Sequence, residues 1–200
     1  MAGTVRYQLK MTSETFIPLA NESALIDRAK ADPTAFAAIY DFYFARIYNY
    51  ARYRVLDPIA ADDLTSEVFE TVLAKLHTYR PERGPFSAWL FTISRNVVNN
   101  HLRKQKIRSW LSLEHFHHLA GREPDLDETV IQREIYHQLL YAVSQLSDRE
   151  RELIALKFSS GLTNRTISTM TGLKESHVAV ILHRAVQRIR AQIDGDKHVK

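Results

Sequence analysis

The chain contains no cysteine and no long apolar run. The lack of cysteine excludes disulfide bonds, thiolate metal sites and cysteine nucleophiles, and it fits a reducing compartment. No stretch approaches the roughly 20 apolar residues that a membrane-spanning helix requires, and residues 1–20 lack the apolar core of a secretory signal. We therefore expect a cytoplasmic protein with no segment inserted in a membrane.

Charge of neither sign dominates the composition. The 200 residues include 27 Lys plus Arg and 23 Asp plus Glu, which gives a net charge of +4, and 45% of the residues are hydrophobic. These proportions are typical of a globular protein and exclude a mainly disordered chain. The small basic excess permits an acidic partner without requiring one. Whether the protein binds such a partner therefore depends on where the charges are placed.

Glycine and proline are also scarce, with six of each, and this leaves long stretches without a helix-breaking residue. Within those stretches, apolar residues recur every three or four positions, which is the spacing of one helical face. We identify no strand. The pattern predicts an all-α protein, with helices near residues 36–50, 58–76, 86–104, 135–146, 148–159, 164–170 and 174–193 and at least four helices before residue 105.

The apolar periodicity fades over residues 105–133. Gly121 and Pro124 interrupt this stretch, and Glu123 to Glu128 contains four acids and no base. Such a composition is typical of a solvated, flexible linker. The sequence therefore predicts two small helical domains, at 21–104 and 134–194, joined by this acidic linker and flanked by tails at 1–20 and 195–200.

Residues 162–185 (LTNRTISTMTGLKESHVAVILHRA) show the layout of a helix-turn-helix. Thr163 is placed to cap a short helix, Gly172 lies in the following turn, and a longer helix comes next. In such a motif the second helix enters the major groove of DNA. The alternative is an ordinary helical hairpin, but the agreement of cap and turn favours the DNA-binding motif.

A second candidate nucleic-acid surface lies on the helix predicted at 86–104. Asn96, Asn100 and Arg103 are spaced i, i+4 and i+7, so they share a face opposite the apolar stripe. Amide and guanidinium side chains suit base edges and phosphates. A solvated basic face is the alternative, and the preceding loop favours nucleic acid because it adds aromatic and basic side chains suited to unpaired bases: Tyr79, Arg80, Arg83 and Phe86.

No residue pattern requires an enzyme, a metal or a cofactor. His115, His117 and His118 lie close together, but no further ligand is spaced to complete a metal site, so solvated linker histidines are favoured. The sequence has no glycine-rich phosphate loop and no evident catalytic triad or carboxylate pair.

Two blocks, taken together, resemble a known family. Residues 62–105 (DDLTSEVFETVLAKLHTYRPERGPFSAWLFTISRNVVNNHLRKQ) resemble the second conserved domain of bacterial sigma factors, and residues 146–190 (LSDRERELIALKFSSGLTNRTISTMTGLKESHVAVILHRAVQRIR) resemble the fourth. Because no other conserved domain lies between them, the chain resembles an extracytoplasmic-function sigma factor of the sigma-70 family.

This resemblance implies a transcription initiation factor that binds the β′ and β subunits of core RNA polymerase and promoter DNA, with an anti-sigma factor as a further partner. The acidic linker would then thread the RNA path of the polymerase. The residues expected to dock on the polymerase are Asp62, Asp63, Leu64, Glu67 and Val68. Those expected at the minus-ten element are Tyr79, Arg80, Arg83, Phe86, Asn96, Asn99, Asn100, Arg103 and Lys104. Those expected at the minus-thirty-five element are Thr163, Lys174, Ser176, His177, His183, Arg184 and Arg188.

The last helix departs from the family pattern. Members of the family often carry Lys-Ser-Arg at the positions where this chain has Ala179, Val180 and Ile181. Two positive charges are therefore missing from this helix. That loss weakens phosphate contact and base readout. Two alternatives follow: a DNA-binding regulator that acts without polymerase, or a sigma-like protein whose altered helix binds a protein partner such as an anti-sigma factor.

Overall fold

The computed structural model describes residues 21–111 and 130–196, and every regular element in these ranges is helical. The first range contains α1 (Glu22–Ala31), α2 (Ala37–Val55), α3 (Pro58–Lys75) and α4 (Phe86–Leu111), with short 3-10 turns at Pro33–Phe36, Leu76–Thr78 and Pro81–Arg83. The second contains α5 (Val130–Ser144), α6 (Asp148–Ser160), α7 (Asn164–Thr171) and α8 (Glu175–Asp196). The prediction of an all-α fold in two helical units is confirmed.

The first unit is built around the apolar stripe of α2. Its buried residues Ile39, Tyr43, Ile47 and Tyr50 recur at helical spacing, and they face the buried sides of α3 and α4. Local signals place the helix boundaries. Asp57 caps α3 by accepting hydrogen bonds from two backbone N–H groups in its first turn, and Pro58 occupies the first helical position, where no N–H is needed.

In the second unit, caps and glycine turns again mark the helix ends. Ser147 and Glu150 form a capping box at the start of α6, since the Ser147 hydroxyl accepts from the Glu150 N–H and the Glu150 carboxylate accepts from the Ser147 N–H. Gly161 and Gly172 end α6 and α7 with φ of 67° and 73°, a left-handed conformation that favours glycine.

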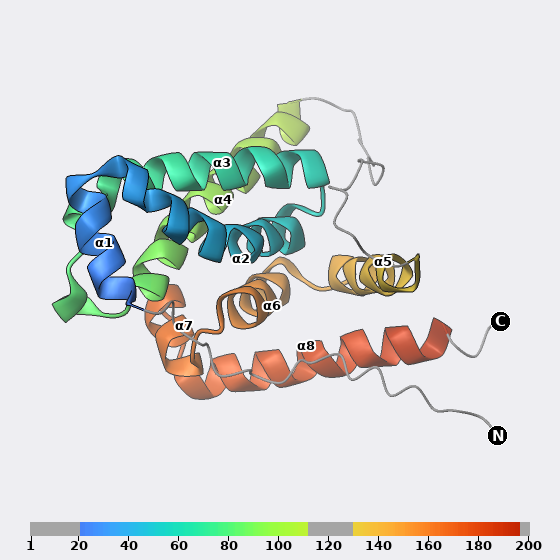
Figure 1. Ribbon diagram of the computed structural model, residues 1–200. Helices are drawn as coiled ribbons and strands as arrows, with labels where there is room; N and C mark the ends of the chain where they lie inside the picture. The colour runs from blue at the N-terminus through green and yellow to red at the C-terminus, as the bar shows by residue number, and fades with distance from the viewer. Residues whose placement is uncertain (1–20, 112–129, 197–200) are drawn as a thin grey trace, which may run out of the picture.

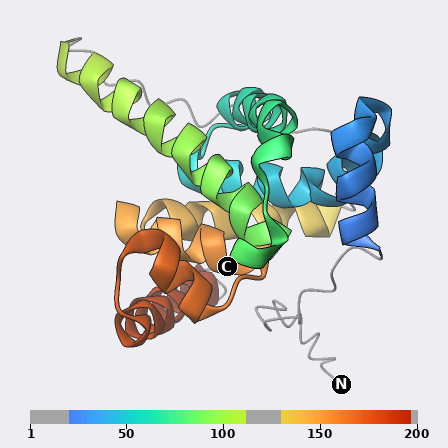
Figure 2. The ribbon, with the colours of Figure 1, turned by 90° about the vertical axis from the view of Figure 1, so that its left-hand side faces the viewer.

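The two units pack against each other. Figure 1 shows α3 above α2, α5 and α6 below it and α8 along the bottom, while α4 runs obliquely from near α7 to the top. Helix α2 contacts α6 closely, and one continuous cluster of buried apolar side chains includes residues of both units. Figure 2, turned by 90°, shows α4 crossing above the orange helices of the second unit.

The predicted linker is shorter than residues 105–133. Helix α4 continues to Leu111, and α5 begins at Val130. Residues 105–108 are exposed and mostly polar, and they continue α4 beyond the core, where apolar periodicity is not needed to form a helix. The acidic run from Glu123 to Glu128 and the histidines at 115–118 lie outside the described residues, as do the tails 1–20 and 197–200.

The capping box of α6 generates a stability prediction. Ser147→Ala removes a cap on a buried helix and is expected to lower the free energy of unfolding by about 1 kcal/mol in urea denaturation. Ser66→Ala, at an exposed position within α3, is the matched control and is expected to change stability by less than about 0.5 kcal/mol. Equal stabilities of the Ser147 variant and the parent would contradict the cap.

The same cap predicts a pH dependence. Burial raises the pKa of Glu150, but the hydrogen bonds from Ser147 and the charge of Arg188 outweigh it, so the pKa lies below its ordinary value of 4.5. A depressed folded-state pKa stabilises the protein above pH 4.5, and this contribution is lost as the pH falls through the folded value. The stability difference between the parent and Ser147→Ala is therefore expected to shrink on acidification below pH 4.5, and a constant difference would contradict the account.

Candidate nucleic-acid interface

Helix α4 exposes the predicted amide and basic face. Asn96, Asn100, Arg103 and Lys104 are all exposed, while Val97 and Val98 are buried on the opposite side. Arg103 donates a hydrogen bond to Oδ1 of Asn100, which draws the guanidinium and the amide together on the surface. The face that can meet base edges and phosphates is therefore the one the sequence predicts.

Asn99 does not belong to that exposed face. It is half-buried, and its Oδ1 accepts a hydrogen bond of 2.9 Å from Arg54 of α2. In this conformation Asn99 links α4 to α2, and its assignment as a DNA contact stays a prediction. The sequence pattern missed this because Arg54 is distant along the chain.

The loop between α3 and α4 places its aromatic residues differently from expectation. Tyr79 and Phe86 are buried in the core, with Phe86 fully inaccessible, and their ring centroids lie 5.2 Å apart. The Tyr79 hydroxyl donates to the carbonyl of Gly84, which closes the loop on itself. Both rings pack against protein in this structure, so their expected stacking on unpaired bases stays a prediction that requires the loop to rearrange.

The basic residues of this loop remain available. Arg80 and Arg83 are exposed, and Arg80 is held by donating to the carbonyls of His77 and Tyr79. Both arginines line a cavity of about 590 Å³ together with Trp89, which is half-buried. Tyr79 also lines this cavity, but Trp89 is the more exposed of the two aromatic residues and the better placed to meet a ligand. The sequence pattern did not identify Trp89 as a ligand-binding residue, because its spacing places it on the apolar face of the helix.

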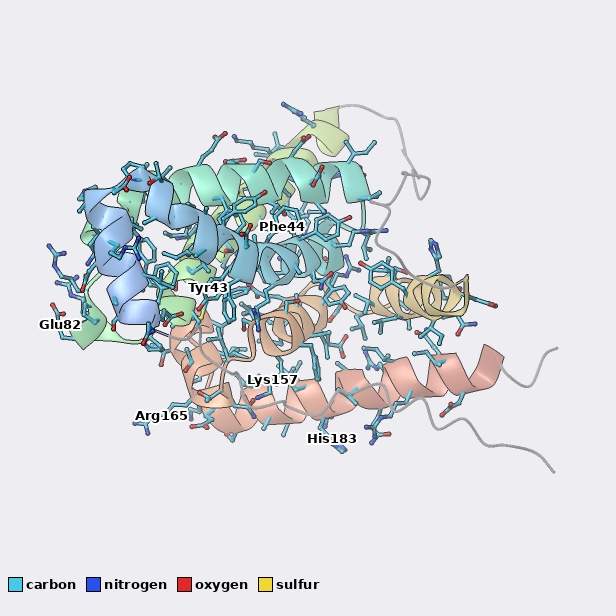
Figure 3. The ribbon with its side chains drawn as sticks, viewed as in Figure 1. Tyr43, Phe44, Glu82, Lys157, Arg165 and His183 are labelled. Atoms are coloured by element: carbon cyan, nitrogen blue, oxygen red, sulfur yellow. The ribbon has the colours of Figure 1, made fainter. Side chains whose placement is uncertain are left out.

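Residues of α7 line the other side of the same cavity: Arg165, Thr166, Thr169 and Met170. Figure 3 labels Arg165 at the end of the molecule where α7 lies, below the loop that carries Glu82. The α3–α4 loop and the first helix of the helix-turn-helix therefore face each other across one cavity.

The exposed face of α3 is acidic. Asp62, Asp63 and Glu67 are exposed, but Leu64 and Val68 are buried in the core. The prediction that Leu64 and Val68 make apolar contact with a partner is corrected, because the same helical periodicity that aligns them turns them toward α2 and α4. They hold α3 in place, and the carboxylates form the surface.

The helix-turn-helix is present. The Thr163 hydroxyl caps α7 by accepting from the Thr166 N–H, and the Ser168 hydroxyl donates across the turn to the Leu173 carbonyl. Buried Ile167, Val178 and Leu182 hold α7 against α8.

The predicted DNA contacts of α8 lie on its exposed side. Lys174, Ser176, His177, His183 and Arg184 are exposed, and Figure 3 shows His183 projecting away from the body of the protein. Arg188 behaves differently, because its Nη1 lies 2.8 Å from Oε1 of Glu150 and thereby joins α8 to α6. Arg188 is nevertheless largely exposed, with 62% of its side chain accessible, so its assignment as a DNA contact stays a prediction.

Charged side chains connect the two units. Arg95 of α4 pairs with Glu152 of α6 at 2.8 Å, and Lys106 of α4 pairs with Asp148 at 2.6 Å. The hydrogen bond from Lys106 lowers the pKa of the Asp148 carboxyl. Basic groups of α4 are therefore already neutralised by carboxylates of α6 in this conformation.

Among the described residues, no group of three or more His, Asp or Glu could hold a metal ion. The helices in the described part of the chain are all too short or too polar to cross a membrane.

Two family models match this chain, in the order that the sequence motifs suggest. The model of sigma-70 region 2 matches residues 39–108, which include α3 and most of α2 and α4. The model of sigma-70 region 4 matches residues 142–191, which include α6, α7 and most of α8. Together they contain most of the described helices.

Similar proteins include several extracytoplasmic-function (ECF) sigma factors. The ECF RNA polymerase sigma factor BldN of Streptomyces coelicolor is 30% identical over 173 residues, which cover 86% of this chain and 66% of BldN. The ECF RNA polymerase sigma factor SigX of Bacillus subtilis is 27% identical over 163 residues, which cover 80% of this chain and 84% of SigX.

A similar fold occurs in the complex of the sigma factor RpoE with the anti-sigma factor NepR from Bartonella quintana. The TM-score is 0.68 at 21% identity, over 80% of this chain and 96% of that one. Since both family models match in order and the relatives share the ECF designation, the chain belongs to the extracytoplasmic-function group of the sigma-70 family.

Proposed function

We infer that this chain is a sigma factor that binds core RNA polymerase and directs transcription initiation at specific promoters. The observation that carries this function is the presence, on one chain and in family order, of a region 2 unit with an exposed amide and basic face and a region 4 unit with a helix-turn-helix. The function consists of binding and DNA melting and involves no covalent chemistry. Because the polymerase works in the cytoplasm, that is where the protein is proposed to act.

The polymerase-docking surface is proposed to be the acidic face of α3. Asp62, Asp63 and Glu67 project from one exposed side of a helix whose buried residues fix its position. An exposed carboxylate cluster suits a basic partner surface and contributes to its rate of association. A direct apolar contribution from Leu64 and Val68 is not part of this proposal, since both are buried.

Minus-ten readout is proposed for Asn96, Asn100 and Arg103, with Lys104 on phosphate. Arg80, Arg83 and Trp89 are proposed to receive a nucleotide of the melted strand, since they combine two guanidinium groups with an accessible indole. Base–aromatic stacking is worth about 1–3 kcal/mol per base, which helps hold the strand open.

Minus-thirty-five contact is proposed for the exposed side of α8, through Lys174, His177 and Arg184, with Thr163 and Ser176 near the entry of the two helices. Val180 is 46% exposed on this helix, next to exposed Ala179, and neither has a side-chain hydrogen-bonding group. This apolar stretch supports weak base readout by region 4. It also supports the second candidate, a protein contact made by the same helix with an anti-sigma factor.

The docking surface is tested by Asp63→Lys combined with Glu67→Lys. The reversed charges meet a basic partner surface with repulsion, and we expect affinity for core polymerase to fall at least about tenfold, or about 1.4 kcal/mol. The measurement is competition with labelled parent protein for purified core polymerase.

The matched control reverses two exposed acids on other helices, Asp27→Lys with Asp41→Lys, and is expected to retain parental affinity. A docking variant that stays folded and competes as well as the parent would contradict the assignment of the α3 face.

Base recognition is expected to depend more on region 2 than on region 4. Asn96→Ala should change which minus-ten sequences are used, with a loss of about 1–3 kcal/mol in discrimination, and leave core binding intact. Arg184→Ala should weaken promoter binding evenly across sequences and reduce its salt dependence, as expected for a phosphate contact. Transcription from a promoter library by both variants is the measurement. Altered preference with Arg184→Ala and unchanged preference with Asn96→Ala would place the readout in the other unit.

A further inference from the structure

The cavity beside the α3–α4 loop has features that the proposed promoter contacts do not use. It measures about 590 Å³, within the range of about 300–1,000 Å³ that is usual for small-molecule sites. The loop and α4 form one side of it, and α7 forms the other. From its lining we propose that this cavity binds a free nucleoside polyphosphate. The site goes beyond the proposed function, and only its competition with the melted strand rests on that function.

The lining contains three arginines and no carboxylate: Arg80, Arg83 and Arg165. All three are exposed, and Arg80 donates to the carbonyls of His77 and Tyr79, which fixes its position and leaves other N–H groups available. Arg83 and Arg165 form no ion pair or side-chain hydrogen bond with the rest of the described chain. Three guanidinium groups around one space suit a ligand with several negative charges, and phosphate groups match the geometry of arginine.

The cavity also contains an accessible indole. Trp89 is half-buried, and its ring centroid lies 5.6 Å from that of Tyr79 and 5.4 Å from that of Phe86. These neighbours hold the indole in place, and its exposed surface can stack on a flat heterocycle. Met170 of α7 lines the opposite side, and a thioether packs well against aromatic rings. The lining therefore suits a ligand that has a ring as well as phosphates.

Threonine hydroxyls add hydrogen-bond acceptors to the lining. Thr92 of α4 donates its hydroxyl hydrogen to the carbonyl of Ala88 at 2.7 Å, and Thr169 of α7 donates to that of Arg165 at 3.1 Å. Each hydroxyl oxygen keeps its capacity to accept. Sugar hydroxyls and exocyclic amino groups can donate to these oxygens, whereas an ionised phosphate has no donor. Cations, a stacking surface and acceptors together match the parts of a nucleotide.

The α7 side distinguishes a free nucleotide from one within a DNA strand. A nucleotide of the melted strand is proposed to meet Arg80, Arg83 and Trp89, and it carries one negative charge on its phosphate. A polyphosphate carries several charges, and Arg165 adds a third guanidinium to meet them. The two ligands share the loop and the indole, so they are expected to compete. Only the free nucleotide is expected to depend on Arg165.

The site is tested by isothermal titration calorimetry of the full chain with ATP, adenosine and inorganic tripolyphosphate. ATP is expected to bind at least about tenfold more tightly than either fragment, because each fragment lacks the contacts that the other would make. Absence of ATP binding would overturn the site. Tripolyphosphate or adenosine that binds as tightly as ATP would also overturn it, because the cavity would then recognise only charge or only a ring.

The role of α7 is tested by Arg165→Gln. The matched control is Arg190→Gln, at an exposed position of α8 outside the cavity. Affinity for ATP is expected to fall about tenfold in the first variant, through loss of a charged hydrogen bond, and to stay parental in the control. Arg165→Lys keeps the charge without the planar fork and is expected to lie between them. Equal affinities of the Arg165→Gln and Arg190→Gln variants would overturn the α7 side of the site.

The position of the ring is tested by fluorescence. The chain has two tryptophans, so Trp110→Phe leaves Trp89 as the only indole emitter. Excited beyond the absorption of adenine, this variant is expected to lose emission when ATP stacks on Trp89 and to keep it with tripolyphosphate. Unchanged emission at ATP concentrations that saturate the protein in calorimetry would overturn the placement of the ring on the indole.

Competition with nucleic acid is measured with a fluorescent pool of random single strands of about 12 nucleotides. Saturating ATP is expected to weaken strand binding by the parent at least about fivefold, because both ligands need the same loop and indole. Arg165→Gln is expected to keep the parental affinity for the strand and to lose most of the ATP effect. Strand and ATP binding without mutual effect would overturn the competition. The site itself is decided by the calorimetry, which does not require that the chain initiates transcription.

Discussion

Burial of the apolar side of α4 is the constraint on which the candidate DNA surface depends. Phe86, Leu90, Val97 and Val98 are fixed in the core, and a helix has only one orientation that buries them all. That orientation sets Asn96, Asn100 and Arg103 outward at helical spacing. The apolar residues that stabilise the fold thus also position the polar residues that are proposed to read a promoter.

The same helix connects the two units through its intermediate side. Arg95 and Asn99 lie between the buried stripe and the exposed face, and there they meet Glu152 and Arg54. One helix therefore has three sides with different roles: core, junction and proposed promoter contact. The division explains why Asn99 and Asn100, adjacent in the sequence, have different environments.

Local sequence signals predicted much of this structure. Apolar spacing predicted the helices, and residues with a clear local mechanism, such as Thr163 as a cap and Gly172 in its turn, placed helix ends correctly. The pattern also predicted which of the amides would be exposed at positions 96 and 100, because those positions oppose the apolar stripe.

The differences between the sequence expectations and the structure have a common physical cause. Aromatic and apolar residues near a proposed site were assigned to partner contact, but Tyr79, Phe86, Leu64 and Val68 bury in the protein's own core. Burial of a large apolar side chain stabilises the fold by about 1.5–3 kcal/mol. Such residues are therefore buried in the core unless the geometry of the chain prevents it. The contacts of Arg54 and Arg95 were also missed, since pairing between residues far apart in the chain leaves no local periodic signal.

The central claim is that this chain converts core RNA polymerase into a promoter-specific enzyme. The most direct measurement is in vitro transcription with purified core polymerase on a library of genomic fragments, followed by mapping of the RNA start sites. The account predicts new start sites that require the protein and share sequence elements near minus ten. Transcription that is the same with and without the protein, under conditions where the protein is folded and binds core polymerase, would contradict it.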